Sequence, residues 1–100
     1  MKKTKTLKMK MHDTELPKWF KGVVYKAGDL VTNPFTGQQA ILTSNELAMY
    51  DFIKGCEYTI SVTFDDDILH PDVARLSNEM RKALDWFRKA NARAYLILLD

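Results

Sequence analysis

Asp65, Asp67 and His70 are the residues whose types and spacing come nearest to a metal site. Carboxylates and imidazoles are common ligands of divalent cations. The spacing matches neither a calcium-binding EF-hand loop, which needs a glycine and a distal glutamate, nor a zinc-binding helix with paired histidines. Acidic residues just before a helix also interact favourably with its positive end. We therefore interpret this cluster as helix-terminus groups and predict no cofactor, with these three residues as the remaining metal candidates.

A nucleophile–base pair is the second chemical candidate, formed by Cys56 with His12 or His70. No cysteine-enzyme signature surrounds Cys56, and it opens an apolar segment, which is typical of a small core residue. As the single cysteine it excludes an internal disulfide and favours a reducing compartment. The chain has no paired carboxylates, Ser-His-Asp set or nucleotide motif that would support catalysis. We predict that it is not an enzyme.

The basic N-terminal segment is a candidate nucleic-acid site, because lysines neutralise phosphates and exposed aromatic rings stack on unpaired bases. Net charge is +6 over residues 1–28, −6 over residues 29–70 and +2 over the remainder. This separation equally fits a basic end that packs against the acidic middle, within the chain or in a neighbouring subunit, and we favour that interpretation. The alternative nucleic-acid site comprises Lys2, Lys3, Lys5, Lys8, Lys10 and Trp19.

A chain of 100 residues with 46% hydrophobic residues predicts one domain over residues 1–100, with residues 1–5 as a flexible basic tail. The lysines at positions 8 and 10 interrupt any apolar signal-peptide core. No apolar run approaches the ~18 residues that a bilayer span needs. We expect a soluble, cytoplasmic protein with no membrane partner.

A helix over residues 44–54 is the best-defined element. Thr43 and Glu46 have the spacing of a capping box, and Gly55 suits the left-handed turn after a helix. The segment is apolar around most of its circumference, so we expect other elements to cover it from more than one side. This helix is the predicted centre of the fold.

Strands are predicted on both sides of that helix. Alternating apolar residues indicate strands at 6–11 and 58–64, and β-prone residues indicate one near 22–26. Residues 30–42 are typical of a hairpin, because Asn-Pro-Phe-Thr-Gly suits a type I turn extended by a left-handed glycine.

Two helices are predicted at the C-terminus, over residues 71–90 and 92–99. Pro71 and Asp72 suit the first turn of the former, which carries an apolar stripe at 3-4 spacing. The latter is short, and an edge strand there is equally compatible with its apolar run. Trp86 lies off the main stripe, so it either marks a subunit contact or completes the core.

Two segments resemble small uncharacterised proteins of marine tailed bacteriophages. One runs from Thr32-Asn-Pro-Phe-Thr-Gly37 through Leu42-Thr-Ser-Asn-Glu-Leu-Ala-Met-Tyr-Asp-Phe-Ile-Lys-Gly55, and the other joins Leu84-Asp-Trp-Phe-Arg-Lys to the Tyr95-Leu-Ile-Leu-Leu-Asp100 ending. Such proteins have no assigned activity, cofactor or site. The resemblance implies a viral gene product that acts in the cytoplasm of an infected bacterium.

These observations predict an α+β fold. A small antiparallel sheet, including the 30–42 hairpin and the strands near 22–26 and 58–64, packs against the central helix 44–54 and the C-terminal helices 71–90 and 92–99. The predicted function is that of a small non-catalytic interaction protein that self-associates. Nucleic-acid binding through the N-terminal segment is the alternative.

Overall fold

The computed structural model describes residues 13–100. The predicted strand at 6–11, the tail at 1–5, the five N-terminal lysines and His12 therefore lie outside the described residues. The described chain forms a two-stranded antiparallel sheet and three helices, which confirms the α+β class. In chain order the elements are β1 (Asp29–Thr32), β2 (Gln39–Leu42), α2 (Ser44–Tyr58), the π-helical turn η1 (Thr59–Thr63), α3 (Pro71–Ala90) and α4 (Ala92–Leu98).

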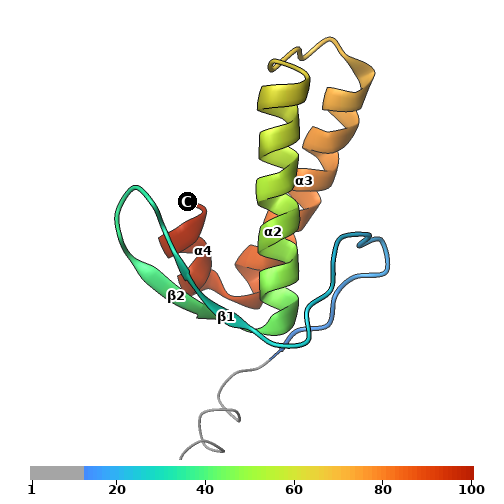
Figure 1. The fold of residues 1–100 in the computed structure, drawn as a ribbon. Coiled ribbons are helices and arrows are strands. Elements are labelled where there is room, and N and C mark those ends of the chain that lie inside the picture. Colours follow the sequence, from blue (N-terminus) through green and yellow to red (C-terminus); the bar gives the residue numbers. More distant parts are fainter. Residues whose placement is uncertain (1–12) are drawn as a thin grey trace, which may run out of the picture.

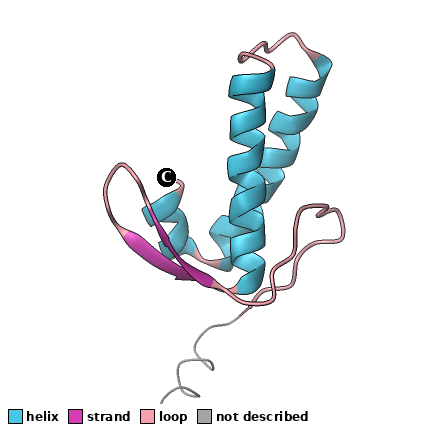
Figure 2. Cartoon of the chain, viewed as in Figure 1, coloured by secondary structure: helices cyan, strands magenta, loops and turns pink. Residues whose placement is uncertain are grey.

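Helices α2 and α3 lie side by side as a tall helical hairpin, with the β-hairpin and α4 grouped around its foot (Figure 1). Residues 13–28, the described part of the segment before β1, contain neither helix nor strand and loop out beside the lower part of α2 (Figure 2). The loop that joins η1 to α3 lies at the far end of the helical hairpin. The molecule therefore has two parts. We call the β-hairpin, α4 and the adjoining ends of α2 and α3 the foot, and we call the rest of α2 and α3, with η1 and the loop after it, the stem.

The β-hairpin is confirmed, with Leu30 opposite Ile41 and Val31 opposite Ala40. At its turn the Asn33 side-chain oxygen accepts hydrogen bonds from two amides of the loop, the nearer at 2.8 Å. Gly37 has a φ of 79°, the left-handed conformation that the sequence predicts at this position. Asn33 Nδ2 also donates to the Ile97 carbonyl at 2.9 Å, which fixes the turn to α4.

Helix α2 begins as predicted but ends later. The Thr43 hydroxyl accepts from the Glu46 amide at 3.2 Å, and the Glu46 carboxylate accepts from the Thr43 amide at 3.0 Å, so the capping box is complete. The predicted end at residue 54 is wrong, because the helix continues through Gly55 to Tyr58. Glycine permits a left-handed stop without enforcing one, and the Thr59 hydroxyl bonds back to the Gly55 carbonyl at 2.8 Å.

The predicted strand at 58–64 is wrong, because this segment prolongs α2 as the π-helical turn η1. Apolar residues at every second position also contain pairs four residues apart, which share one side of a helix. Ile60 and Phe64 form such a pair and are half-buried, whereas Tyr58 and Val62 are exposed. The alternating pattern is therefore used at helical spacing, since packing against α3 overrides β propensity.

The predicted strand near 22–26 is also wrong. This segment is irregular, and Val23 and Val24 are 67% and 64% exposed. It is held by side chains, since the Tyr25 hydroxyl donates a hydrogen bond to the Asp51 carboxylate of α2. A run of β-prone residues with no neighbouring strand to pair with has no reason to remain extended.

The two C-terminal helices are confirmed, and α3 spans the predicted residues 71–90. His70 Nδ1 caps α3 by accepting from the Asp72 amide at 3.1 Å, with Pro71 at the first helical position. Asn91 closes α3 and caps α4, which ends at Leu98, one residue before the predicted end. The edge-strand alternative for this segment is wrong.

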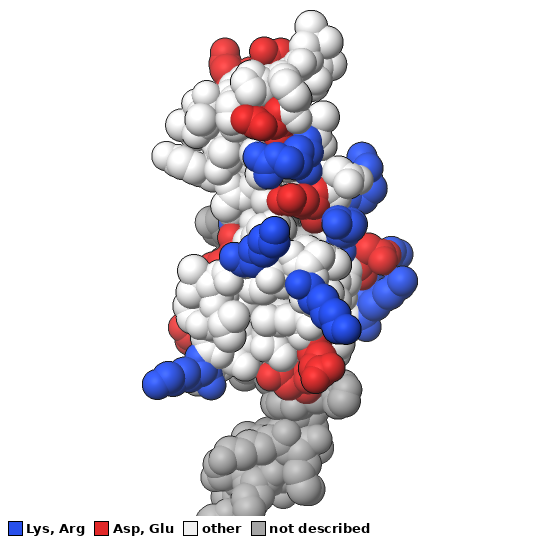
Figure 3. Space-filling view, turned by 90° about the vertical axis from the view of Figure 1, so that its right-hand side faces the viewer, with Lys and Arg blue, Asp and Glu red and all other residues white. Residues whose placement is uncertain are grey.

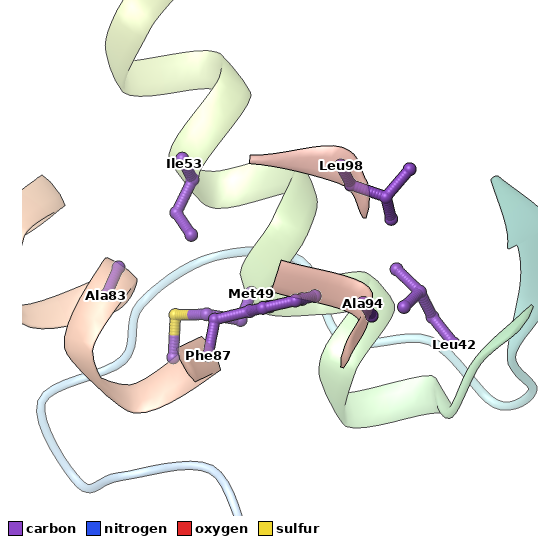
Figure 4. Close-up of a cluster of buried hydrophobic side chains, with 7 residues drawn as sticks. All are labelled: Leu42, Met49, Ile53, Ala83, Phe87, Ala94 and Leu98. Carbon is purple, nitrogen blue, oxygen red and sulfur yellow. The ribbon is translucent and has the colours of Figure 1, made fainter. Parts of the chain in front are cut away.

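The hydrophobic core lies at the foot, where all three helices and β2 meet (Figure 4). Phe87, Met49 and Ile53 are fully buried. Higher on the stem only Cys56 and Val73 are buried among the described residues. The irregular segment before β1 borders α2 there, since Val23 and Tyr25 line a hollow with Cys56 and Thr59. The core side chains are Leu42, Met49, Ile53, Ala83, Phe87, Ala94 and Leu98.

Candidate interaction surfaces

The metal candidates lie in the loop between η1 and α3, and their polar atoms serve the backbone. Asp67 accepts from the Leu69 amide at 3.0 Å, and His70 caps α3. Asp65 has a left-handed φ of 51° and shapes the turn. Within residues 13–100 no group of three or more His, Cys, Asp or Glu side chains is arranged to hold a metal ion.

Cys56 lies in α2 and is 4% exposed. Burial raises the pKa of its thiol, and the nearby Glu79 carboxylate raises it further. A catalytic thiol needs a lowered pKa and access to substrate, so this environment favours the core interpretation. His70 uses its Nδ1 in the helix cap and lies against the Phe64 ring, with ring centroids 4.5 Å apart.

Trp19 is half-buried against the core. Its ring lies 6.3 Å from that of Phe52, and Lys82 Nζ lies 4.9 Å from its centroid. One face of the indole is therefore covered by a cation from the same chain, which leaves less surface for stacking on a base. Trp86 donates from Nε1 to the Glu15 carbonyl at 3.1 Å and packs on the core cluster, so it completes the core.

Four of the ten exposed large hydrophobic side chains of the described residues lie at the far end of the stem. Ile68 and Leu69 are 80% and 87% exposed, in the loop before α3. Acidic side chains crowd this end, as the upper part of Figure 3 shows. We call this surface the tip; it comprises the exposed apolar residues Tyr58, Val62, Ile68 and Leu69 and the acidic run Asp65, Asp66 and Asp67.

A second surface feature is a hollow of about 570 Å³ between α3 and α4, near the foot. Leu84 and Tyr95 supply its apolar lining, and its other side chains are charged. Hydrogen bonds from Lys89 and from Arg88 hold the pKa of the Asp85 carboxyl below its ordinary value. We call it the basic hollow, after the balance of its lining residues Arg81, Lys82, Leu84, Asp85, Arg88 and Tyr95.

The β-hairpin is another exposed apolar surface, and Phe35 in its turn is 92% exposed. Leu30 and Ile41 face each other across the strands and are 50% and 62% exposed. The opposite face, with Val31 and Ala40, packs against the core. The hairpin therefore has one face covered by its own chain and one apolar pair in the open.

Sequence reasoning missed both the tip and the basic hollow. The sequence predicts helix-terminus groups for the acidic run and an alternating strand for residues 58–64, and neither prediction places an exposed apolar surface there. The charge separation along the chain was the available signal, since it places acidic residues before α3 and basic ones in its second half. The hollow depends on how α4 folds back on α3, which no local pattern encodes.

Comparison with protein-family models gave no match, and neither did comparison with curated proteins or with solved structures. None of the helices in residues 13–100 is long and apolar enough to cross a membrane.

Proposed function

We propose that this protein is a small non-catalytic interaction protein that associates with further copies of itself. The observation that supports this is the tip, where four large apolar side chains within twelve residues are more than half exposed. Contiguous apolar patches on monomers are small, and larger ones mark interaction sites. The stem projects from the core with only two helices. Helices of a partner could pack against it to form a four-helix bundle.

Burial of the apolar side chains of the tip in an interface would contribute substantially to the free energy of association. Fully burying an isoleucine or leucine side chain contributes about 1.5–3 kcal/mol relative to leaving it exposed. Ile68 and Leu69 are almost entirely exposed, so an interface that covered both would gain most of that amount for each. Association still has to offset the lost freedom of two separate molecules, so a weak to moderate dimer is the expected outcome.

The titratable groups support a non-catalytic role. The pKa values of Tyr25, Cys56 and Asp85 are shifted, and each shift has a local structural cause. The pKa of Tyr25 is raised because its hydroxyl donates to Asp51, and the pKa of Cys56 is raised because the thiol is buried. The pKa of Asp85 is lowered by hydrogen bonds from Lys89 and Arg88. Tyr25 and Cys56 line one hollow of about 340 Å³ together with Asp51, whereas Asp85 lines other hollows along α3.

The test is a mass measurement by light scattering and sedimentation over a range of concentrations. The full chain is expected to shift from one copy to a larger defined mass as concentration rises. The variant I68S/L69S is expected to stay monomeric at concentrations where the wild type associates. V23S/V24S removes similarly exposed apolar side chains elsewhere and is the matched control. A one-copy mass at every concentration would reject the proposal.

Nucleic-acid binding through the N-terminal segment stays the alternative prediction, with the residues Lys2, Lys3, Lys5, Lys8, Lys10 and Trp19. The phage resemblance and an infected-cell cytoplasm stay predictions under either function. Fluorescence anisotropy with labelled DNA and RNA, at low and moderate salt, distinguishes the two functions. Saturable binding that weakens with salt and with deletion of residues 1–10 would favour the alternative. Flat titrations for the full chain and for the variant that lacks residues 1–10 would reject nucleic-acid binding and leave self-association as the proposal.

A further inference from the structure

Acidic and basic residues gather in different stretches of the chain, apart from Arg75, which lies between them and pairs with Asp72 and Glu79. Residues 57–72 contain five acidic residues and no lysine or arginine, whereas residues 81–93 contain five basic residues and one acidic residue. The first stretch covers the tip and the start of α3, and the second covers the end of α3 and the start of α4. The acidic residues are Glu57, Asp65, Asp66, Asp67 and Asp72, and the basic residues are Arg81, Lys82, Arg88, Lys89 and Arg93.

The two surfaces are also complementary in chemistry. The tip combines exposed aliphatic side chains with carboxylates, and the basic hollow combines an apolar lining with guanidinium and ammonium groups. Arg81 and Arg88 are seven residues apart, which is about two turns of helix, so they lie on the same side of α3. Planar guanidinium groups can bind carboxylates with two parallel hydrogen bonds. Arg88 already pairs with Asp85 of its own chain, so a partner's carboxylate would share this arginine with Asp85.

We propose that the tip of one copy occupies the basic hollow of a second copy, reciprocally, so that two stems pair antiparallel. This inference rests on the proposed self-association and names its surfaces. Within one chain the tip lies at the far end of the stem and the hollow lies near the foot, so they meet only between copies. From Asp72 to Leu84 the helix rises by about 18 Å, which sets the overlap of the two stems.

Reciprocal pairing follows from symmetry. In a two-fold dimer each contact occurs twice, so a tip in the partner's hollow places the partner's tip in its own hollow. The paired stems then form a four-helix arrangement, which adds a layer to α2 and α3 above the core. The charge pattern opposes the parallel arrangement, because it would place the two acidic tips side by side.

Charge-swap variants test this pairing. The hollow-reversed variant R81E/R88E and the tip-reversed variant D66K/D67K should each dimerise at least tenfold more weakly than the wild type. An equimolar mixture of the two should recover a mixed dimer, because each acidic surface then meets a basic one. K18E/K26E changes two basic residues of the irregular N-terminal segment and should dimerise like the wild type.

A gentler variant guards against misfolding at the tip. D65N/D66N/D67N removes the charge but keeps the oxygen acceptors and tolerates left-handed backbone, and it should also dimerise more weakly. Circular dichroism and thermal melts test whether each variant is folded. Dimerisation of every variant at wild-type strength would overturn the tip–hollow contact while leaving self-association intact. Masses that grow beyond two copies would overturn the reciprocal pairing, and a monomeric wild type would overturn both proposals.

Discussion

Asn91 Nδ2 donates a 3.1 Å hydrogen bond to Glu46 Oε1 and so joins the corner between α3 and α4 to the first turn of α2. Glu46 is 2% exposed, and the same oxygen accepts from the Thr43 amide. Asn91 also accepts from the Ala94 amide at 3.0 Å. This pair of side chains therefore caps the start of α2 and of α4, and the backbone amide of Asn91 closes α3 by donating to the Phe87 carbonyl.

Replacing Asn91 by alanine should be one of the most destabilising polar substitutions. The change removes the cap of α4 and leaves the buried Glu46 carboxylate with one hydrogen bond fewer. Loss of a cap costs about 1 kcal/mol, and loss of a hydrogen bond to a charged group costs about 1.5–3 kcal/mol. Urea unfolding should show a free energy of unfolding about 2–4 kcal/mol below that of the wild type. Asn78 is exposed on α3, and N78A should lie within about 0.5 kcal/mol of the wild type.

Two glycines should respond in opposite directions to alanine. A Cβ at Gly28 would lie 1.8 Å from the Leu42 carbonyl oxygen, where β1 begins beside the end of β2, so G28A must distort backbone. Gly55 lies inside α2 with no atom near its added Cβ, and alanine there should raise the free energy of unfolding by about 0.5–1 kcal/mol. Thermal melts of both variants provide the check. Equal melting temperatures would contradict the close approach at Gly28.

Local signals predicted the parts of the fold that local contacts build. The capping box at Thr43, the turn at Asn33 and the proline start of α3 each depend on residues a few positions apart, and each is present. The segment 58–64 shows the limit. Its apolar residues satisfy a strand and a helix equally, and the choice depends on contact with α3, which lies beyond the loop.

The candidate surfaces were harder to predict than the elements. Ile68 and Leu69 precede a helix, where apolar residues are usually covered, and only the projection of the stem leaves them exposed. The basic hollow requires Arg88 and Tyr95, which belong to different helices, to face a common space. Such features arise from tertiary packing, and a single sequence carries only their charge signature.

Cys56 should react slowly with alkylating reagents in the folded protein. Burial raises its pKa, so less thiolate is present at pH 8 than for an exposed cysteine, and access is restricted as well. Because the pKa is higher in the folded state, the stabilisation from the neutral thiol is present below the unfolded pKa and is lost as pH rises through the folded pKa. Iodoacetamide labelling followed by mass spectrometry, with urea-unfolded protein as the control, gives both rates. Equal rates would contradict the buried environment.

Replacing Asp66 by glycine should leave the protein more stable than replacing it by alanine. Asp65 and Asp66 are consecutive residues with left-handed φ values of 51° and 57°, a conformation that costs a residue with a Cβ roughly 1–2 kcal/mol. D66G and D66A remove the same charge from the tip, so the difference between them isolates the backbone. The free energy of unfolding of D66G should exceed that of D66A by about 1–2 kcal/mol in urea titrations at low protein concentration, where association does not contribute. If D66G and D66A have the same free energy of unfolding, the left-handed turn is not required at the tip.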